Sequence, residues 1–226
     1  SHRDLASRIA KASRARLLIF NYRLAPEHPF PAGLEDARKV WTWLRHRYQT
    51  HHITLAGDSA GGGLALALAA SLIDQHQPMP DAVVIMSPWT DLACPDTRAH
   101  SQNRDRDFML NRKLLQQTAR MYTTGDLSSP LISPVNHGFN GMPPTLIQVG
   151  GNEILLDDAR RLAQQLENTG SDVKLEIWEG MFHVWHYFAK YLSEGRDAIT
   201  RIGEFIQARA AAKAPNASHS ETGRMN

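Results

Sequence analysis

Residues 52–65 read HITLAGDSAGGGLA, and three local signals follow one another in that short segment. An apolar run at residues 53–56 meets Gly-x-Ser-x-Gly at residues 57–61, and an Ala- and Leu-rich segment then continues to about residue 73. A strand, a turn of small residues and a helix in this order form a nucleophile elbow, which lifts a serine hydroxyl above the C-terminal edge of a parallel sheet. The segment therefore predicts a nucleophile at Ser59.

The small residues of this motif have a physical reason. Ser59 must take a strained backbone conformation, and we expect the strand and the helix to cross so closely that side chains at Gly57 and Gly61 would clash. The helix that begins at Ala60 directs its free N–H groups and its positive dipole end toward the reacting oxygen. A mere glycine-rich turn is the alternative interpretation, because Gly-x-Ser-x-Gly also occurs by chance. The flanking strand and helix favour the nucleophile.

The composition is that of an ordinary soluble domain, with 226 residues, 42% hydrophobic and 21% charged. The net charge of +2 comes with scattered basic residues, which gives no indication of a nucleic-acid partner. The longest apolar stretch, residues 64–72, is too short to span a bilayer, and the polar start shows no signal peptide. The single cysteine, Cys94, excludes an internal disulfide and fits a reducing compartment, so we expect a cytoplasmic protein.

The hydrophobic pattern predicts alternating strands and helices. Five strands are expected, at residues 16–21, 53–56, 82–87, 145–149 and 173–178. Helices are expected at residues 3–11, 34–48, 60–73, 112–122, 157–168 and 195–210. This alternation favours a parallel sheet with helices on both faces. We expect residues 87–107 to form a loop, and residues 211–226, which are small and polar, to be a disordered tail.

A serine nucleophile needs a base that takes its proton. His183 lies just past the last predicted strand, where the loop returns over the sheet edge, and we predict it as the base. His186 is the nearest rival, but we expect it in a following helical turn that faces away. His51 and His52 precede the elbow strand at its far end, so we expect both to be exposed and to bind no metal. Cys94 is a weak alternative nucleophile, because no base is spaced to serve it.

The base needs a carboxylate that orients it, and three follow the strand that ends at residue 149. Asp157 and Asp158 stand at the start of a helix, where an acidic side chain caps free N–H groups and meets the positive dipole end. Glu153 has no such structural reason and lies in a glycine-rich turn that can bring it toward His183. We predict Glu153 as the acid, within ~3.2 Å of His183 Nδ1, with Asp157 as the runner-up.

Four segments together resemble the bacterial hormone-sensitive lipase-like esterases, also called family IV carboxylesterases, of the α/β-hydrolase fold. They are YRLAPEHPFPA at residues 22–32, GDSAGGGL at residues 57–64, SPWTDL at residues 87–92 and SPLISP at residues 129–134. The resemblance runs from about residue 1 to residue 210. It implies one catalytic domain over residues 1–210, with a mostly parallel sheet flanked by helices and a cap-like insert at about residues 95–125.

The resemblance also implies a chemistry. Ser59 would be the nucleophile, His183 the base, and Asp58 a supporting residue of the elbow together with Gly57 and Gly61. The glutamate of the predicted triad is a variant that some members of the family carry in place of the commoner aspartate. The implied reaction is hydrolysis of short-chain acyl esters through an acyl-enzyme intermediate, without a metal or cofactor.

The chain departs from that family at its start. The family carries a His-Gly-Gly-Gly loop upstream, whose backbone N–H groups supply most of the oxyanion hole, and the sequence contains no such loop. We therefore interpret it as a fragment or truncated product that lacks N-terminal strands and the oxyanion loop. Ala60 would be the remaining oxyanion donor. Loss of one donor costs on the order of 10²–10³ in rate, so we expect little activity from this chain alone.

Other functions stay open at this point. A ligand-binding member of the same fold, as in the plant gibberellin receptors, would lack the triad histidine, whereas His183 is present here. A catalytically impaired remnant is the second alternative, and lactones, long-chain esters and amides are alternative substrates. We expect a small-molecule ester as the substrate, with no nucleic acid or membrane as a partner. A homodimer through the edge strand at residues 173–178 and the closing helix at residues 195–210 is our expectation for assembly.

Overall fold

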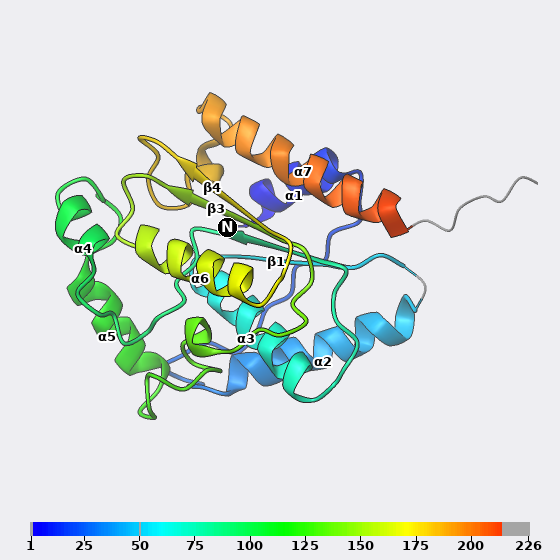
Figure 1. Cartoon of the computed structure of the whole chain (residues 1–226), viewed down its shortest axis with the longest axis horizontal. Coiled ribbons are helices and arrows are strands. Elements are labelled where there is room, and N and C mark those ends of the chain that lie inside the picture. The colour runs from blue at the N-terminus through cyan, green and yellow to red at the C-terminus, as the bar shows by residue number, and fades with distance from the viewer. Residues whose placement is uncertain (1, 50, 214–226) are drawn as a thin grey trace, which may run out of the picture.

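The computed structural model describes residues 2–49 and 51–213 of the chain. Its centre is one parallel sheet, in which the strands lie side by side in chain order (Figure 1). The strands are β1 (Thr54–Asp58), β2 (Ala82–Met86), β3 (Thr145–Gly150) and β4 (Val173–Trp178). The two inner strands are buried along their whole length, as their largely apolar runs predict.

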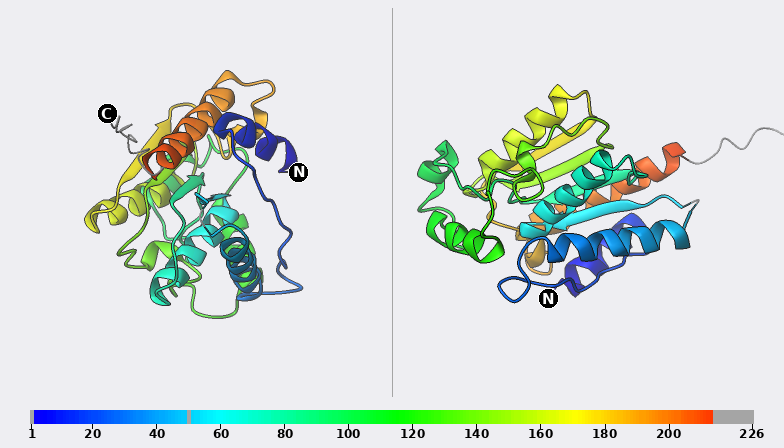
Figure 2. Two further views of the ribbon diagram at one scale, coloured as in Figure 1. Left: turned by 90° about the vertical axis from the view of Figure 1, so that its right-hand side faces the viewer. Right: turned by 90° about the horizontal axis from the view of Figure 1, so that it is seen from below.

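Helices cover both faces of this sheet. They are α1 (Arg3–Ser13), α2 (Ala32–Arg47), α3 (Ala60–Asp74), α4 (Arg98–Asn103), α5 (Arg112–Tyr122), α6 (Leu156–Asn168) and α7 (Ser193–Lys213), with the short 3-10 helices η1 (Pro134–Asn136) and η2 (Trp185–Phe188). α1 and α7 pack side by side on one face, while α3 and α6 cover the other face and α2 packs against α3 (Figures 1 and 2). α4 and α5 lie together at one side of the molecule (Figure 1).

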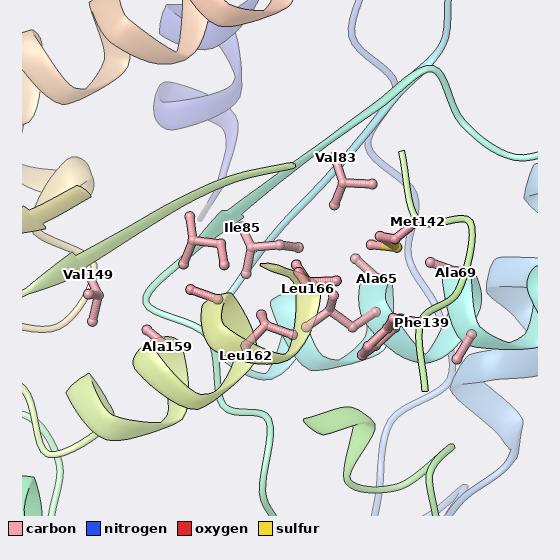
Figure 3. Close-up of a cluster of buried hydrophobic side chains, with 14 of the residues drawn as sticks. Ala65, Ala69, Val83, Ile85, Phe139, Met142, Val149, Ala159, Leu162 and Leu166 are labelled. Atoms are coloured by element: carbon pink, nitrogen blue, oxygen red, sulfur yellow. The ribbon is translucent and has the colours of Figure 1, made fainter. Parts of the chain in front are cut away.

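The core forms on both faces because successive side chains of a strand point in opposite directions. Val83 and Ile85 of β2 belong to a buried cluster with α3 and α6, which Figure 3 shows. Val84 and Met86 of the same strand belong instead to a cluster with α1 and α7. The apolar run of β2 therefore has a helical layer to pack against on each face, and the sheet is a rigid base for the loops that leave its ends.

Residues 16–21 do not form a strand, so that prediction is wrong. Leu17, Leu18 and Ile19 are 39%, 49% and 48% exposed. β1 pairs with β2, and within the described residues no strand lies on the other side of β1. Without a neighbouring strand, an apolar run gains neither the hydrogen bonds of a ladder nor full burial.

The predicted loop of residues 87–107 contains the short helix α4, which the sequence analysis missed. Thr97 caps this helix by accepting a hydrogen bond from the backbone N–H of His100 at 3.3 Å. The Nδ1 atom of His100 in turn lies 2.7 Å from the Pro95 carbonyl oxygen, to which it donates, so this side chain holds the residues just before the helix. The helix is short and polar, so hydrophobic periodicity did not indicate it.

The C-terminal part follows the predictions except at its very end. β4 lies at the edge of the described sheet, as expected. Glu176 on this strand is only 8% exposed, and its burial is tolerated because Gln148 donates to its carboxylate at 2.9 Å and Lys174 pairs with it at 2.7 Å. Residues 211–213 continue α7 and are not a disordered tail, and the rest of that predicted tail, residues 214–226, lies outside the described residues.

Candidate active site

The elbow lies where β1 ends and α3 begins, as the sequence predicts. Ser59 has a φ of 53° and a ψ of −123°, which is a strained conformation for a residue other than glycine. Gly57 permits the close crossing, because a Cβ there would lie 2.6 Å from the carbonyl carbon of Gly61. A Cβ on Gly61 would meet no atom within 4 Å, so the clash predicted at that position is wrong. Gly61 contributes its backbone to the crossing, whereas its own Cα faces open space.

Ser59, His183 and Glu153 form a continuous chain of hydrogen bonds. The Nε2 atom of His183 lies 2.9 Å from Ser59 Oγ, and its Nδ1 atom lies 2.9 Å from Oε2 of Glu153. Glu153 is fully buried and His183 is 5% exposed. The structure thus brings together the three side chains that the sequence analysis singled out, in the order serine, histidine, carboxylate.

Two turns carry the acid and the base to the serine. Glu153 lies between β3 and α6, and His183 lies between β4 and η2. Because β3 and β4 are parallel neighbours, both turns leave the same edge of the sheet. They also pack on each other. The backbone N–H of Asn152 donates to the Met181 carbonyl at 3.0 Å, and a Cβ on Gly150 would lie 2.7 Å from the Met181 carbonyl carbon.

Ser87, for which no site role was predicted, also belongs to this hydrogen-bond network. Its Oγ donates to Oε1 of Glu153 at 2.7 Å, and the Gly150 N–H donates to the same oxygen at 2.6 Å. Ser87 directly follows β2, is fully buried and has a φ of 45°. The sequence offered two signals, the position of Ser87 at the end of an apolar strand and its place at the start of the SPWTDL segment. Neither indicated Glu153 as its partner, because 66 positions separate the two residues.

The two aspartates at the start of α6 bind other loops, which corrects the prediction that they cap their own helix. Asp157 accepts a hydrogen bond from the backbone N–H of Ala99, the second residue of α4, at 2.7 Å. Asp158 accepts from the backbone N–H groups of Thr90 and Asp91 at 2.9 and 3.0 Å. Burial raises the pKa of Asp158 to about 6. Both carboxylates therefore accept hydrogen bonds from backbone N–H groups of the segment that connects β2 to α5.

His186, the rival base, belongs to η2 and is fully buried. Its Nε2 atom lies 2.8 Å from Oε1 of Gln148 on β3, so this ring is hydrogen-bonded to the sheet and not to Ser59. Burial, together with a smaller effect of the nearby His183, lowers the pKa of His186 to about 3. A histidine held neutral in this way cannot exchange protons with a substrate near neutral pH.

The remaining candidates lie apart from the serine. His51 is exposed, as predicted, but the side chain of His52 is only 15% exposed, and its Nδ1 atom lies 3.8 Å from Asp81. His52 is therefore not exposed, which corrects the prediction for this residue. Cys94 is buried, and burial raises the pKa of its thiol to about 11. A thiol with that pKa is not a nucleophile at neutral pH.

Asp58 supports the elbow from β1. Its Oδ2 atom accepts a hydrogen bond from the hydroxyl of Tyr187 at 3.1 Å, and its Oδ1 atom lies 3.3 Å from Nε2 of His2. Burial, followed by the negative charge of Asp58, raises the pKa values of Tyr22 and Tyr187, so both phenols stay protonated. The carboxylate therefore ties the residue before Ser59 to η2.

A cavity of about 230 Å³ opens beside the first turn of α3. Ala60 and Gly63 of this turn form part of its wall. Side chains of four other parts of the chain contribute to its mostly apolar wall: Tyr22 and Leu24, Trp89 and Leu92, Met121 and Tyr122, and Leu131 and Ile132. The cavity therefore lies next to the backbone N–H that follows Ser59. Among the described residues, no group of three or more histidine, cysteine, aspartate or glutamate side chains is arranged to hold a metal ion.

The described ranges also contain no helix that is both long and apolar enough to cross a lipid bilayer.

Comparison with known proteins gives consistent results. Residues 1–187 match the model of the alpha/beta hydrolase fold family. An acetyl-hydrolase of Streptomyces hygroscopicus is 44% identical over 209 residues, which cover 92% of this chain and 70% of that protein. An esterase of Acinetobacter venetianus is 33% identical over 91% of this chain and 68% of its own length.

Solved structures give the same picture. An esterase from the bacterial hormone-sensitive lipase family superposes with a TM-score of 0.89 and is 43% identical, over 92% of this chain and 71% of that one. An esterase/lipase from an uncultured bacterium also superposes with a TM-score of 0.89, at 41% identity, over 93% of this chain and 71% of that one. The chain thus spans about 70% of the length of several of its relatives.

Proposed function

The chain belongs to the α/β-hydrolase fold family, among the hormone-sensitive lipase-like carboxylesterases, and from this we propose that it hydrolyses short-chain acyl esters through a Ser-His-Glu triad. Ser59 is the nucleophile, His183 the base and Glu153 the acid that orients the base. One observation carries the proposal. The hydrogen bonds from Ser59 Oγ to His183 Nε2 and from His183 Nδ1 to Glu153 form an unbroken chain, and each is 2.9 Å long.

The first half of the reaction forms the acyl-enzyme. Ser59 Oγ attacks the carbonyl carbon of the ester while its proton passes to His183 Nε2. Glu153 accepts a hydrogen bond from Nδ1–H and stabilises the imidazolium that results. His183 then gives the proton to the alcohol oxygen as the bond between carbon and that oxygen breaks. In the second half, water attacks the acyl carbon while its proton passes to His183 Nε2. His183 then returns the proton to Ser59 Oγ, and the carboxylic acid product leaves.

Ala60 supplies a donor for the oxyanion. Its N–H belongs to the first residue of α3, where N–H groups have no acceptor within the helix. The positive end of the helix dipole adds to the attraction. Because negative charge grows on the carbonyl oxygen as the serine attacks, this donor stabilises the transition state more than the substrate.

The cavity beside Ala60 supports a short acyl chain. Its volume is about 230 Å³, which is below the roughly 300–1,000 Å³ of typical small-molecule pockets. The wall is mostly apolar and includes Leu92, Trp89 and Ile132, which suits hydrocarbon and not a charged acyl group. The acyl chain would point into this cavity from the carbonyl carbon at Ser59.

A fluorophosphonate probe tests the nucleophile, because it forms a covalent bond with an activated serine. We expect labelling at Ser59 that is lost in Ser59→Ala and strongly reduced in His183→Ala, with Ser71→Ala, which changes a buried serine of α3, as the control. The test uses residues 1–226 and a second form, extended with the part of the Streptomyces relative that has no counterpart here. Equal labelling of Ser59→Ala and of the unchanged protein in both forms would contradict the proposal.

A series of p-nitrophenyl esters tests the substrate class. We expect kcat/KM to be highest for acetate and butyrate and to fall for octanoate and laurate, because the cavity holds only a short chain. A lactone of similar size is included in the same series. A maximum at laurate, or a preference for the lactone, would overturn the short-chain ester as the substrate while leaving the triad in place.

A further inference from the structure

We infer that Ser87 is a positioning residue, which holds the acid and the base of the triad in one fixed geometry. The inference rests on the proposed function, since Ser87 acts through Glu153 and through the loop of His183. The structure gives the Ser87 hydroxyl two partners. It donates to Oε1 of Glu153 at 2.7 Å and accepts from the backbone N–H of Val184 at 3.0 Å. One hydroxyl therefore connects the end of β2 to the acid turn and to the base loop.

The bond to Glu153 fixes which oxygen faces the histidine. Oε1 receives hydrogen bonds from Ser87 and from the Gly150 N–H, which leaves Oε2 for His183 Nδ1 at 2.9 Å. A buried carboxylate needs such donors, because burial without them disfavours its charge. The second bond acts on the base directly, since Val184 is the residue after His183 and has a φ of 47°. Ser87 thus fixes both partners of the central hydrogen bond.

The backbone of Ser87 is strained. Its φ of 45° is a conformation that residues other than glycine rarely adopt, although the position is fully buried. A glycine would adopt the same conformation at no steric cost, but it has no hydroxyl. The backbone N–H of Ser87 also donates to the Gln148 carbonyl at 2.7 Å, so the strained residue is held from the neighbouring strand. Strain of this kind is concentrated at functional sites.

A purely structural role is the competing explanation, and Ser133 provides a matched control for it. Ser133 is also fully buried. Its hydroxyl accepts from the Leu92 N–H at 2.7 Å and donates to the Leu127 carbonyl at 2.6 Å. Both serines are therefore fully buried, and each hydroxyl accepts one hydrogen bond from a backbone N–H and donates one. The partners differ, because only the Ser87 hydroxyl bonds to Glu153 and Val184.

Loss of the Ser87 hydroxyl is also expected to shift the pH dependence of kcat/KM in a definite direction. With one donor fewer, the negative charge of Glu153 acts more strongly on His183 and stabilises its protonated form. The rise of kcat/KM with pH would then occur at a higher pH. His186 of η2 also lies near His183, but burial lowers the pKa of His186 to about 3, so this second imidazole stays neutral near neutral pH.

The experiment compares Ser87→Ala with Ser133→Ala on the most active substrate, in the form of the protein with measurable turnover. For Ser87→Ala we expect kcat to fall about 10- to 100-fold with little change in KM, as for loss of one hydrogen bond to a charged group. The acidic limb of kcat/KM should move up by about half a pH unit. Ser133→Ala should leave kcat and this limb unchanged. Equal kcat values and limbs in both variants and in the unchanged protein would overturn the inference.

Two further variants separate positioning from folding. Ser87→Gly removes the hydroxyl but relieves the strained backbone, so it should fold and still lose activity as Ser87→Ala does. In a Glu153→Ala background, Ser87→Ala should cost little more, because its main target is already gone. Full activity in Ser87→Gly, or fully additive losses in the double variant, would show that Ser87 is only structural. If the unchanged protein neither hydrolyses esters nor labels at Ser59, the proposed function itself has failed.

Discussion

Three residues around the site have a positive φ although none is a glycine: Ser59 at 53°, Ser87 at 45° and Val184 at 47°. Ser59 and Ser87 each directly follow a strand, and Val184 directly follows His183. The backbone N–H of each donates to an acceptor on another strand or just past its end. Such conformations persist only where the surrounding structure determines them from several sides. At the scale of single residues, the site is therefore a set of strained positions joined by short, buried hydrogen bonds.

The choice between the carboxylates gives the first prediction. Glu153→Gln keeps the size of the side chain but removes the charge that orients His183, so we expect kcat to fall by about 10³- to 10⁴-fold. Asp157→Asn is the matched control, because Asp157 lies in the first turn of α6 and accepts from the backbone N–H of Ala99. It should change kcat by no more than a few-fold. Steady-state kinetics of both variants, with circular dichroism as a check on folding, decides between them, and the reverse ranking would assign the acid to Asp157.

The buried histidine gives a prediction about stability. Burial lowers the pKa of His186 to about 3, so below its ordinary value of 6.5 the unfolded chain takes up a proton that the folded state does not. The contribution of His186 to the free energy of unfolding is thus present above pH 6.5 and is lost as pH falls. Between pH 6.5 and 4.5 we expect a loss of about 2 to 3 kcal/mol from this residue.

His186→Gln tests this pH dependence, because its amide can still donate to Gln148 but does not titrate. Urea unfolding at several pH values should give a shallower fall in stability for the variant than for the unchanged protein. Parallel curves for the two proteins would mean that His186 does not control the acid sensitivity.

At the scale of elements, the crossing of β1 and α3 is made possible by one glycine. A Cβ on Gly57 would lie 2.6 Å from the carbonyl carbon of Gly61 and 2.9 Å from the backbone nitrogen of Gly62. These are backbone atoms, which cannot move without displacing the helix and the serine that precedes it. On Gly61 itself the added carbon would lie in open space, within a helix that favours alanine.

We therefore predict opposite outcomes for two similar substitutions. Gly57→Ala should lower the free energy of unfolding by several kcal/mol, of the order of about 3, as for other backbone clashes in a core. Gly61→Ala should be neutral or stabilise by up to about 1 kcal/mol. Thermal or urea unfolding of both variants is the measurement. A large loss of stability in Gly61→Ala would mean that the crossing is closer at that position than in this structure.

At the scale of the whole molecule, each strand of the sheet contributes one member of the network at its end. Ser59 follows β1, Ser87 follows β2, Glu153 lies in the turn after β3, and His183 lies in the turn after β4. The strands lie in that same order and are all parallel. Parallel neighbours place all four turns at one edge of the sheet, so residues that are up to 124 positions apart meet there.

The edge of the sheet at β4 supports the proposed homodimer. β4 has one neighbour, β3, in the described sheet, and a hollow of about 380 Å³ beside it is lined by Leu175, Trp178 and Arg201, among others. Glu176 is paired with Lys174 and Arg201, so the edge carries less unbalanced charge than its sequence indicates. An unpaired strand edge with little net charge is a template for pairing with a second chain.

We predict a dimer at micromolar concentration, with twice the chain mass of 25.3 kDa, by light scattering. Hydrogen exchange of the β4 amides should slow as the protein concentration rises, which would localise the contact to this edge. A monodisperse monomer would contradict the proposal. A dimer whose β4 exchange does not depend on concentration would assign the contact to another surface.

The sequence by itself determined the parts of this protein that depend on contiguous residues. The elbow was predictable because strand, strained serine and helix follow one another, and their chemistry needs small residues at fixed spacing. Glu153 was predictable by elimination, since Asp157 and Asp158 had an ordinary reason to stand at a helix start. That reason was itself incorrect, because both aspartates bind the loop after β2.

Only the tertiary structure decided which distant segments meet. The bond between Ser87 and Glu153 depends on β2 and β3 being neighbours, which no local pattern records. The apolar run at residues 16–21 has the composition of a buried strand, yet it stays half exposed because a strand is stable only beside another strand. Local propensity thus determines what a segment can become, whereas pairing and burial across the fold determine what it becomes.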